Sequence, residues 1–329
     1  MPPPQNRFVS AQQVADLAGV SRSAVSRTFT DGASVSPKTR DKVLIAAEQL
    51  GYHVNHLARG LHTSSNIICL ITTDISTPFQ SRFIDNLTRQ LQQINKVAMI
   101  INTKGDKQLV SHALTQTLNF RAEASIILSG QPDNGLIERC ISNGQRVLMV
   151  NRDYQNSSAE LIRYDAIQAA QQVVELFTSQ NCKRLLIINS DVHSSSLRGR
   201  QEAVLKVAKE KGLSTKVVRF GDTSYNSGDH MSLEYTKDID GVFCVTDLLA
   251  CGFLDGLRKQ SVCVPEDTIV VGFDDIEQAS WDSYQLTTFS QPVETICAHI
   301  IERLQAEPTD LENEWVYSVQ PILRKTTKH

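Results

Sequence analysis

Most of the chain alternates short apolar runs with amphipathic stretches, and this alternation restricts the folds open to it. From residue 67, runs such as "IICLIT" and "VAMIIN" are each followed by a segment with helical spacing of apolar residues, and a second such series begins near residue 165. Buried strands separated by helices form parallel sheets that are covered on both faces. The two series therefore predict an α/β body of two doubly wound, parallel-sheet lobes.

Polar and aromatic residues follow several predicted strands of this body. In open parallel sheets, ligands bind beyond the carboxyl ends of the strands, so a cleft between the lobes is the expected site. A carboxylate, a guanidinium and an aromatic ring in one cleft suit a polyhydroxylated ligand. Other roles stay open, since Asp247 could cap a helix and Arg152 could pair with Asp153 or another acid. The candidates are Asp74, Phe79, Asn151, Arg152, Asp247 and Asp274.

The first 52 residues follow a different, all-helical pattern. Ser10 and Gln13 have the spacing of a capping box, which opens a helix ending near Ala18. A turn containing glycine follows, and Ser21 is the N-cap of a second helix. Two helices joined by such a turn form the helix-turn-helix pattern. The sequence therefore predicts a small helical head in front of the α/β body.

The second helix of the head has two distinct sides. At 100° per residue, Ala24, Val25 and Thr28 turn inward, while the other side is polar. An arginine at this place can read guanine in the major groove of DNA. A solvated polar face would have the same composition, so both interpretations stay open for this helix alone. The polar side consists of Arg22, Ser23, Ser26 and Arg27.

Charge is unevenly distributed along the chain. Residues 1–65 hold seven of the 33 Lys and Arg residues and four of the 36 Asp and Glu residues, which gives +3 there and −6 elsewhere. A basic head on an acidic body favours a polyanionic partner for the head. Seven unpaired cysteines predict buried free thiols in a reducing compartment. Because no apolar signal core or membrane-length run is found, we expect a soluble, cytoplasmic protein without membrane contact.

The segment "VSAQQVADLAGVSRSAVSRTFTDGASVSPKTRDKVLIAAEQLGYHVNHLARGLHT" resembles the DNA-binding head of the lactose/galactose repressor (LacI/GalR) family of transcription regulators. The likeness continues more loosely to the end of the chain. It implies a body of the periplasmic-binding-protein-like type, a DNA-binding repressor and no enzymatic activity, cofactor or metal. The implied domains are a helix-turn-helix head (1–52), a hinge helix or linker (53–65), an N-terminal lobe (66–164 plus 290–329) and a C-terminal lobe (165–289).

The resemblance also implies how the head meets double-stranded DNA. In the family, two hinge helices of a dimer pair in the minor groove, where a leucine wedges between base steps. Leu61 takes that place here, with Leu57, Ala58 and Arg59 beside it. A homodimer further predicts a near-palindromic operator. The predicted phosphate contacts are Ser10, Ser21, Lys38 and Asn55.

The family's interlobe cleft binds sugars or related small effectors, which control operator affinity. The resemblance favours Asp274 and an arginine in "SSSLRGRQEAV" as effector contacts. Arg200 matches the register of the family's arginine and Arg198 is the alternative, because the glycine and aromatic residue that usually follow are absent. Thr223 stands where some sugar-binding members carry an aromatic ring.

Two other classes of protein can share an α/β body of this kind. A solute-binding receptor would need an export signal and would have no use for the head. A nucleotide-dependent enzyme would need a phosphate-binding loop, yet Gly130 and Gly135 have Walker spacing without the Lys-Ser/Thr that must follow. Both classes are disfavoured.

Overall fold

The computed structural model describes residues 9–30, 32–52, 65–104, 107–130, 132–152, 159–306 and 313–328. Within these residues the chain divides into two compact units, Met1–Ser65 and Asn66–His329.

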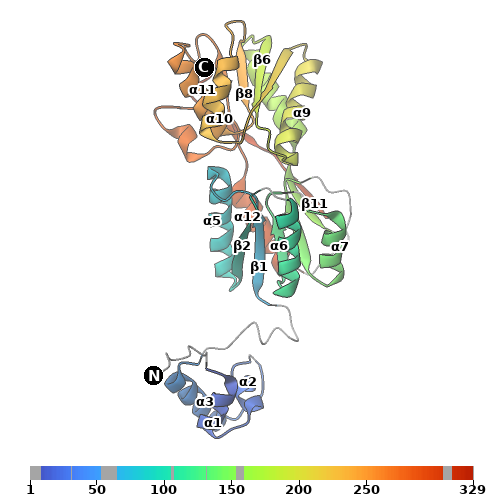
Figure 1. The fold of residues 1–329 in the computed structure, drawn as a ribbon, viewed down its shortest axis with the longest axis vertical. Helices are drawn as coiled ribbons and strands as arrows, with labels where there is room; N and C mark the ends of the chain where they lie inside the picture. The colour runs from blue at the N-terminus through green and yellow to red at the C-terminus, as the bar shows by residue number, and fades with distance from the viewer. Residues whose placement is uncertain are drawn as a thin grey trace. The chain divides into compact units, whose positions relative to one another are not determined.

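The first unit, the head, packs three helices around a small apolar core. Val14, Val25 and Val43 are fully buried there, one from each helix. The predicted capping box is present: the Ser10 hydroxyl accepts from the Gln13 amide at 3.3 Å, and the Gln13 side chain accepts from the Ser10 amide at 2.8 Å. The helices, drawn in blue in Figure 1, are α1 (Ala11–Ala18), α2 (Arg22–Thr28) and α3 (Pro37–Leu50).

The second unit, the body, consists of two lobes, as the alternating pattern predicted. The elements of the first lobe are β1 (Ile67–Thr72), α5 (Pro78–Gln93), β2 (Val97–Asn102), α6 (Lys107–Asn119), β3 (Ala124–Ile127), α7 (Asn134–Ser142), β4 (Arg146–Val150), β5 (Glu160–Tyr164), α12 (Val293–Gln305) and β11 (Glu314–Tyr317). Its six strands form a parallel sheet in the order β11-β5-β4-β3-β1-β2. Helices α5 and α12 cover one face of this sheet, and α6 and α7 cover the other (Figure 1).

The second lobe has a smaller parallel sheet, in the order β7-β6-β8-β9, and a separate antiparallel pair, β10-β12. Helices α8 and α9 pack against each other, as do α10 and α11. The elements are α8 (Ala166–Ser179), β6 (Arg184–Asn189), α9 (Ser195–Glu210), β7 (Ser214–Arg219), α10 (Tyr225–Met231), η1 (Ser232–Glu234), β8 (Gly241–Cys244), α11 (Asp247–Lys259), β9 (Ile269–Val271), η2 (Glu277–Ser280), β10 (Thr288–Ser290) and β12 (Gln320–Ile322).

The chain passes between the lobes after β5, after β10 and after β11 in the described part of the body. The expectation that residues 290–329 complete the N-terminal lobe is wrong for their last part. Helix α12 and strand β11 belong to that lobe, but β12 pairs with β10 and the Val270 amide donates to the Thr326 carbonyl at 3.1 Å. The final described residues therefore complete the second lobe.

The seven cysteines are free thiols, and six of them are buried. Cys263 is the exception to the expected burial, because it is exposed. Burial raises the pKa of the Cys69 thiol to about 12, so this thiol stays protonated at neutral pH. None of the helices in the described residues is long and apolar enough to cross a bilayer.

Candidate functional sites

The polar side of α2 is exposed, and the opposite side is buried in the head. Ala24, Val25 and Thr28 are 8%, 0% and 4% exposed, as the helical wheel predicted. Neither Arg22 nor Arg27 makes an ion pair within the described part of the chain. The helix thus presents two guanidinium groups and two hydroxyls to solvent. The exposed residues on this side are Arg22, Ser23, Ser26 and Arg27.

The predicted phosphate contacts of the head lie at the starts of helices. The Ser10 and Ser21 side chains accept from amides of the first turns of α1 and α2, and both residues are exposed. Lys38 is exposed in the first turn of α3. The hinge predictions, Asn55, Leu57, Ala58, Arg59 and Leu61, lie outside the described residues.

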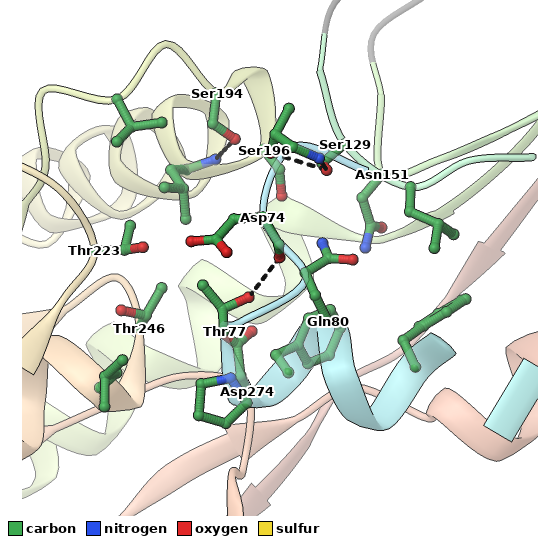
Figure 2. A pocket seen from close by; sticks show the side chains of 18 of the residues that line it. Asp74, Thr77, Gln80, Ser129, Asn151, Ser194, Ser196, Thr223, Thr246 and Asp274 are labelled. Atoms are coloured by element: carbon green, nitrogen blue, oxygen red, sulfur yellow. Dashed lines mark hydrogen bonds between the residues drawn. The ribbon is translucent and has the colours of Figure 1, made fainter. Parts of the chain in front are cut away.

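A cavity of about 580 Å³ lies between the lobes of the body. Both lobes contribute to its wall, which contains residues that follow β1, β3 and β4 in the first lobe and β6, β7 and β8 in the second. Figure 2 shows Asp74, Asn151, Thr223 and Asp274 arranged around it. The predicted residues that line the cavity are Asp74, Phe79, Asn151, Arg152, Arg200, Thr223 and Asp274.

Of the two candidate arginines, Arg200 is the one at the cavity. It is 4% exposed, and its guanidinium lies 3.6 Å from the centre of the Phe273 ring and 3.3 Å from the Asp274 carboxylate. Arg198 is exposed to solvent two residues earlier on α9. Burial raises the pKa of Asp274, while the charge of Arg200 and a hydrogen bond from Gln291 oppose that shift. The ion pair therefore offsets part of the cost of burying this carboxylate.

Five residues at and behind the cavity wall form a closed ring of contacts. Gln291 donates to Asp274 at 2.8 Å, and Asn151 donates to Gln291 at 2.9 Å. The Asn151 side chain accepts from the Tyr164 amide at 3.1 Å, and Arg200 donates to the Tyr164 hydroxyl at 3.1 Å. The Arg200–Asp274 ion pair closes this interlobe ring. Since Asn151 belongs to the first lobe and Arg200 and Asp274 to the second, the ring connects the two lobes.

The prediction that Asp247 faces the cavity is wrong. Asp247 is fully buried behind the wall, and only its neighbours Thr246 and Leu248 line the cavity. Its carboxylate accepts from the Thr288 hydroxyl at 2.6 Å and from the Ile276 amide at 3.0 Å. Nor does it cap α11, because Thr246 is the N-cap and Asp247 is the first helical residue.

Arg152 lines the cavity from a buried position. It is 7% exposed and donates to the Leu128 carbonyl at 3.0 Å and to Ser195 at 3.3 Å. The alternative partner Asp153 lies outside the described residues. Arg152 therefore bridges the lobes, since Leu128 follows β3 in the first lobe and Ser195 begins α9 in the second.

Several lining residues were missed by the sequence analysis. Gln291 is the most consequential, because it holds Asp274 and Asn151 together. Ser129 and Thr246 also line the wall shortly after β3 and β8, and Ser194 and Ser196 line it from the start of α9. The rule of polar residues at strand ends would have identified the first two, whereas the other two lie at the start of a helix. Among the described residues, no cluster of His, Cys, Asp and Glu suited to a metal ion is present.

A helix-turn-helix head with an exposed basic face, followed by two lobes that wall a cavity, defines a class of protein: regulators in which one unit meets DNA and another meets a small molecule. Comparison with known proteins identifies the family within this class. Residues 11–55 match the description "Bacterial regulatory proteins, lacI family", and residues 174–327 match "Periplasmic binding protein-like domain".

Curated relatives match most of the chain. The HTH-type transcriptional regulator GalS of Salmonella typhimurium is 26% identical over 87% of this chain and 86% of its own length. The ribose operon repressor of Escherichia coli is 27% identical over 87% of this chain and 88% of its own length. The relatives named here are transcription regulators rather than enzymes.

Solved structures share the fold. A Lac repressor dimer bound to operator and the anti-inducer ONPF matches with a TM-score of 0.83 at 23% identity, covering 98% of this chain and 99% of that one. A LacI family regulator from Enterococcus faecium with bound ribose matches with a TM-score of 0.69 at 17% identity, covering 79% and 98%. The chain therefore carries a LacI family helix-turn-helix domain and a periplasmic-binding-protein-like domain, and its relatives are regulators of that family.

Proposed function

We propose that this protein is a DNA-binding transcription repressor whose affinity for its operator is set by a small effector in the interlobe cavity. The observation that carries the proposal is the pairing of two surfaces in one chain: the exposed basic face of α2 and a cavity walled by both lobes. One of the relatives is an operon repressor, which supports repression rather than activation. We infer a regulator rather than an enzyme, acting in the cytoplasm, where bacterial DNA lies.

The α2 face is the proposed base-reading surface. Arg22 and Arg27 are long enough to reach guanine edges in the major groove, with Ser23 and Ser26 between them. Ser10, Ser21 and Lys38 lie on the same unit at helix starts, where amides and hydroxyls meet phosphates. Asn55 is the further proposed phosphate contact.

The hinge segment is the proposed minor-groove contact. Leu61 is the apolar wedge in this proposal, and Leu57, Ala58 and Arg59 accompany it. Apolar side chains inserted between base steps bend the duplex and widen the contact surface. Two copies of the chain are needed for two such wedges, so we propose a homodimer on a near-palindromic operator. A Lac repressor, with which this chain shares its fold, binds its operator as a dimer.

The proposed effector is a sugar or sugar derivative. Carboxylate, amide and hydroxyl groups from both lobes surround the cavity, and Phe79 supplies an aromatic surface. The proposed contacts are Asp74, Phe79, Asn151, Arg152, Arg200, Thr223 and Asp274. Ribose occupies a regulator of the same fold, which supports this class of ligand.

Coupling between cavity and operator runs through the lobes in this proposal. A ligand that bonds to Asp274 or Asn151 competes with members of the interlobe ring and so changes how the lobes meet. Couplings of this kind are typically about 1–3 kcal/mol and are reciprocal, so DNA changes effector affinity by the same factor.

The test has two arms on the full-length protein. Selection from random duplexes is expected to yield a near-palindromic site, and the double variant Arg22→Ala, Arg27→Ala is expected to lose preference for it. In a thermal-shift screen of sugars, sugar phosphates and nucleobases, a ligand that binds in the cavity is expected to raise the melting temperature of the wild type. Arg200→Ala is expected to lose this shift, and the matched control Arg198→Ala is expected to keep it. A protein without sequence preference for DNA would contradict the proposal.

A further inference from the structure

The buried carboxylate of Asp247 holds a short turn of the second lobe. The turn comprises residues 272–276, between β9 and η2. The Asp247 amide donates to the Phe273 carbonyl at 2.9 Å, and the Asp247 side chain accepts from the Ile276 amide at 3.0 Å. The other carboxylate oxygen accepts from the Thr288 hydroxyl on β10 at 2.6 Å. One residue thus fixes both ends of the turn and ties it to a strand.

The turn adopts a conformation that needs such support. Asp274 has a φ of 113° and Asp275 a φ of 51°, a region of backbone geometry that residues with a side chain rarely occupy. Gly272 leaves space for the carboxylate, because a Cβ there would lie 2.1 Å from an Asp247 oxygen. Strained residues persist only where surrounding contacts determine their conformation. The contacts of Asp247 are of that kind.

The same turn carries contacts between the lobes. Asp274 belongs to the interlobe ring through Arg200 and Gln291. The Asp275 carbonyl accepts from Arg82, on α5 of the first lobe, at 3.3 Å. The Asp275 carboxylate accepts from Arg324 at 2.7 Å. A change in the turn therefore alters the contacts that the second lobe makes with Arg82 and, through Gln291, with Asn151 of the first lobe.

We propose that Asp247 is a positioning residue for this turn, and that gain or loss of a proton on its carboxyl changes the turn and the contacts that it makes between the lobes. The carboxylate form accepts two strong hydrogen bonds, from Ile276 and Thr288. The protonated form carries its own donor on one oxygen and accepts there more weakly. One of the two bonds must then weaken. The inference concerns a proton and does not depend on which effector binds.

Burial and the neighbouring charges bring the protonation of Asp247 near neutral pH. Burial and the neighbouring charge of Asp274 raise the pKa of Asp247 to about 7. The two thiols that face it stay protonated, because burial raises the pKa of Cys251 to about 12 and that of Cys244 well above its usual value. The titratable and charged groups that act on Asp247, or are acted on by it, are Asp274, Asp275, Arg200, Cys244 and Cys251.

The experiment measures the protonation of the Asp247 carboxyl and the conformation of the turn by separate signals, in the full-length chain without effector. Infrared titration measures the protonated carboxyl stretch, and Trp281 fluorescence reports on the turn, since η2 and Trp281 follow it directly. Trp315→Phe leaves Trp281 as the single tryptophan, because the sequence has two. Both signals are expected to change together near pH 7. Asp247→Asn is expected to abolish both changes.

Two further variants separate a proton effect from a merely structural one. Thr288→Val keeps the carboxyl but removes a hydrogen bond to its charged form, so both midpoints are expected to rise by about one pH unit. Asp267→Asn changes an exposed carboxylate of the same lobe and is expected to leave both midpoints in place. The proposal is overturned if the infrared and fluorescence changes persist in Asp247→Asn. It is also overturned if their pH midpoints stay the same in Thr288→Val. If Asp247→Asn does not fold, the shift of the midpoints in Thr288→Val tests the proposal by itself.

Discussion

The two surfaces assigned to function differ in how their side chains are held. On α2 the polar residues point to solvent, and Arg22 and Arg27 make no ion pair in the described residues. In the cavity wall, Arg200, Asp274 and Gln291 are buried and bonded to one another. The first surface should tolerate substitution without loss of stability, whereas the second combines recognition with structure. Each prediction below strengthens or breaks this contrast.

The largest effect is expected from Arg200→Ala. Removal of one member of a buried ion pair leaves the other charge uncompensated, which costs about 3–5 kcal/mol. Urea unfolding of the body would measure it. Arg198→Ala, on the exposed side of the same helix, should stay within about 0.5 kcal/mol of the wild type. Equal losses in the two variants would show that the interlobe ring does not stabilise the body.

The second effect concerns pH. The folded pKa of Asp247, about 7, exceeds the value near 3.9 expected of the unfolded chain, so between these values the folded protein binds a proton that the unfolded chain does not. The contribution of this group to the free energy of unfolding is therefore full below pH 4 and lost as pH rises through 7. The difference between wild type and Asp247→Asn should fall by roughly 2 kcal/mol from pH 5 to pH 8. Denaturation at both pH values measures it, and a constant difference would contradict the assignment.

A comparable or smaller loss is expected from Gln291→Leu. This change leaves the Asn151 amide and the Asp274 carboxylate each without one partner, at a cost of about 1–3 kcal/mol. Unfolding measurements should be combined with thermal shifts for any sugar that binds the wild type. Gln171→Leu, which changes an exposed glutamine on α8, is the control. If Gln291→Leu is as stable as the wild type, the interlobe ring serves ligand recognition and does not stabilise the fold.

The α2 face should show the opposite behaviour. Arg22→Ala and Arg27→Ala are each expected to weaken binding of the selected operator by about 1–3 kcal/mol, with no measurable change in unfolding. Competition binding against operators with single base changes would measure the effect. A loss of stability in either variant would remove the contrast between the two surfaces.

The smallest effect is expected from Lys38→Ala. If Lys38 contacts a phosphate, binding should weaken uniformly across sequences, and the slope of log affinity against log salt should fall by about one. Titrations at several salt concentrations measure this slope. Sequence-dependent weakening would instead place Lys38 among the residues that read bases.

The sequence predicted the head better than the cavity because the two depend on different information. A helix of seven residues has a fixed period, so the exposed and buried sides of α2 follow from spacing alone. The choice of Arg200 over Arg198 came instead from the resemblance to the family's arginine. Strand β5 was not anticipated, because five residues that are partly polar give little periodic signal. Gln291 and the true place of Asp247 depend on how distant segments meet, which spacing along the chain does not encode.

The division of the C-terminal region between lobes has a consequence for biosynthesis. Because β12 and residues up to 328 pack on the second lobe, that lobe stays unfinished on the ribosome long after its own helices have emerged. A premature stop after β11 would complete the first lobe yet expose the apolar surface that Val319 and its neighbours cover in the second. Quality-control proteases should therefore remove such a truncated chain. The defect that they recognise would lie in the second lobe, although the new terminus would lie in the first.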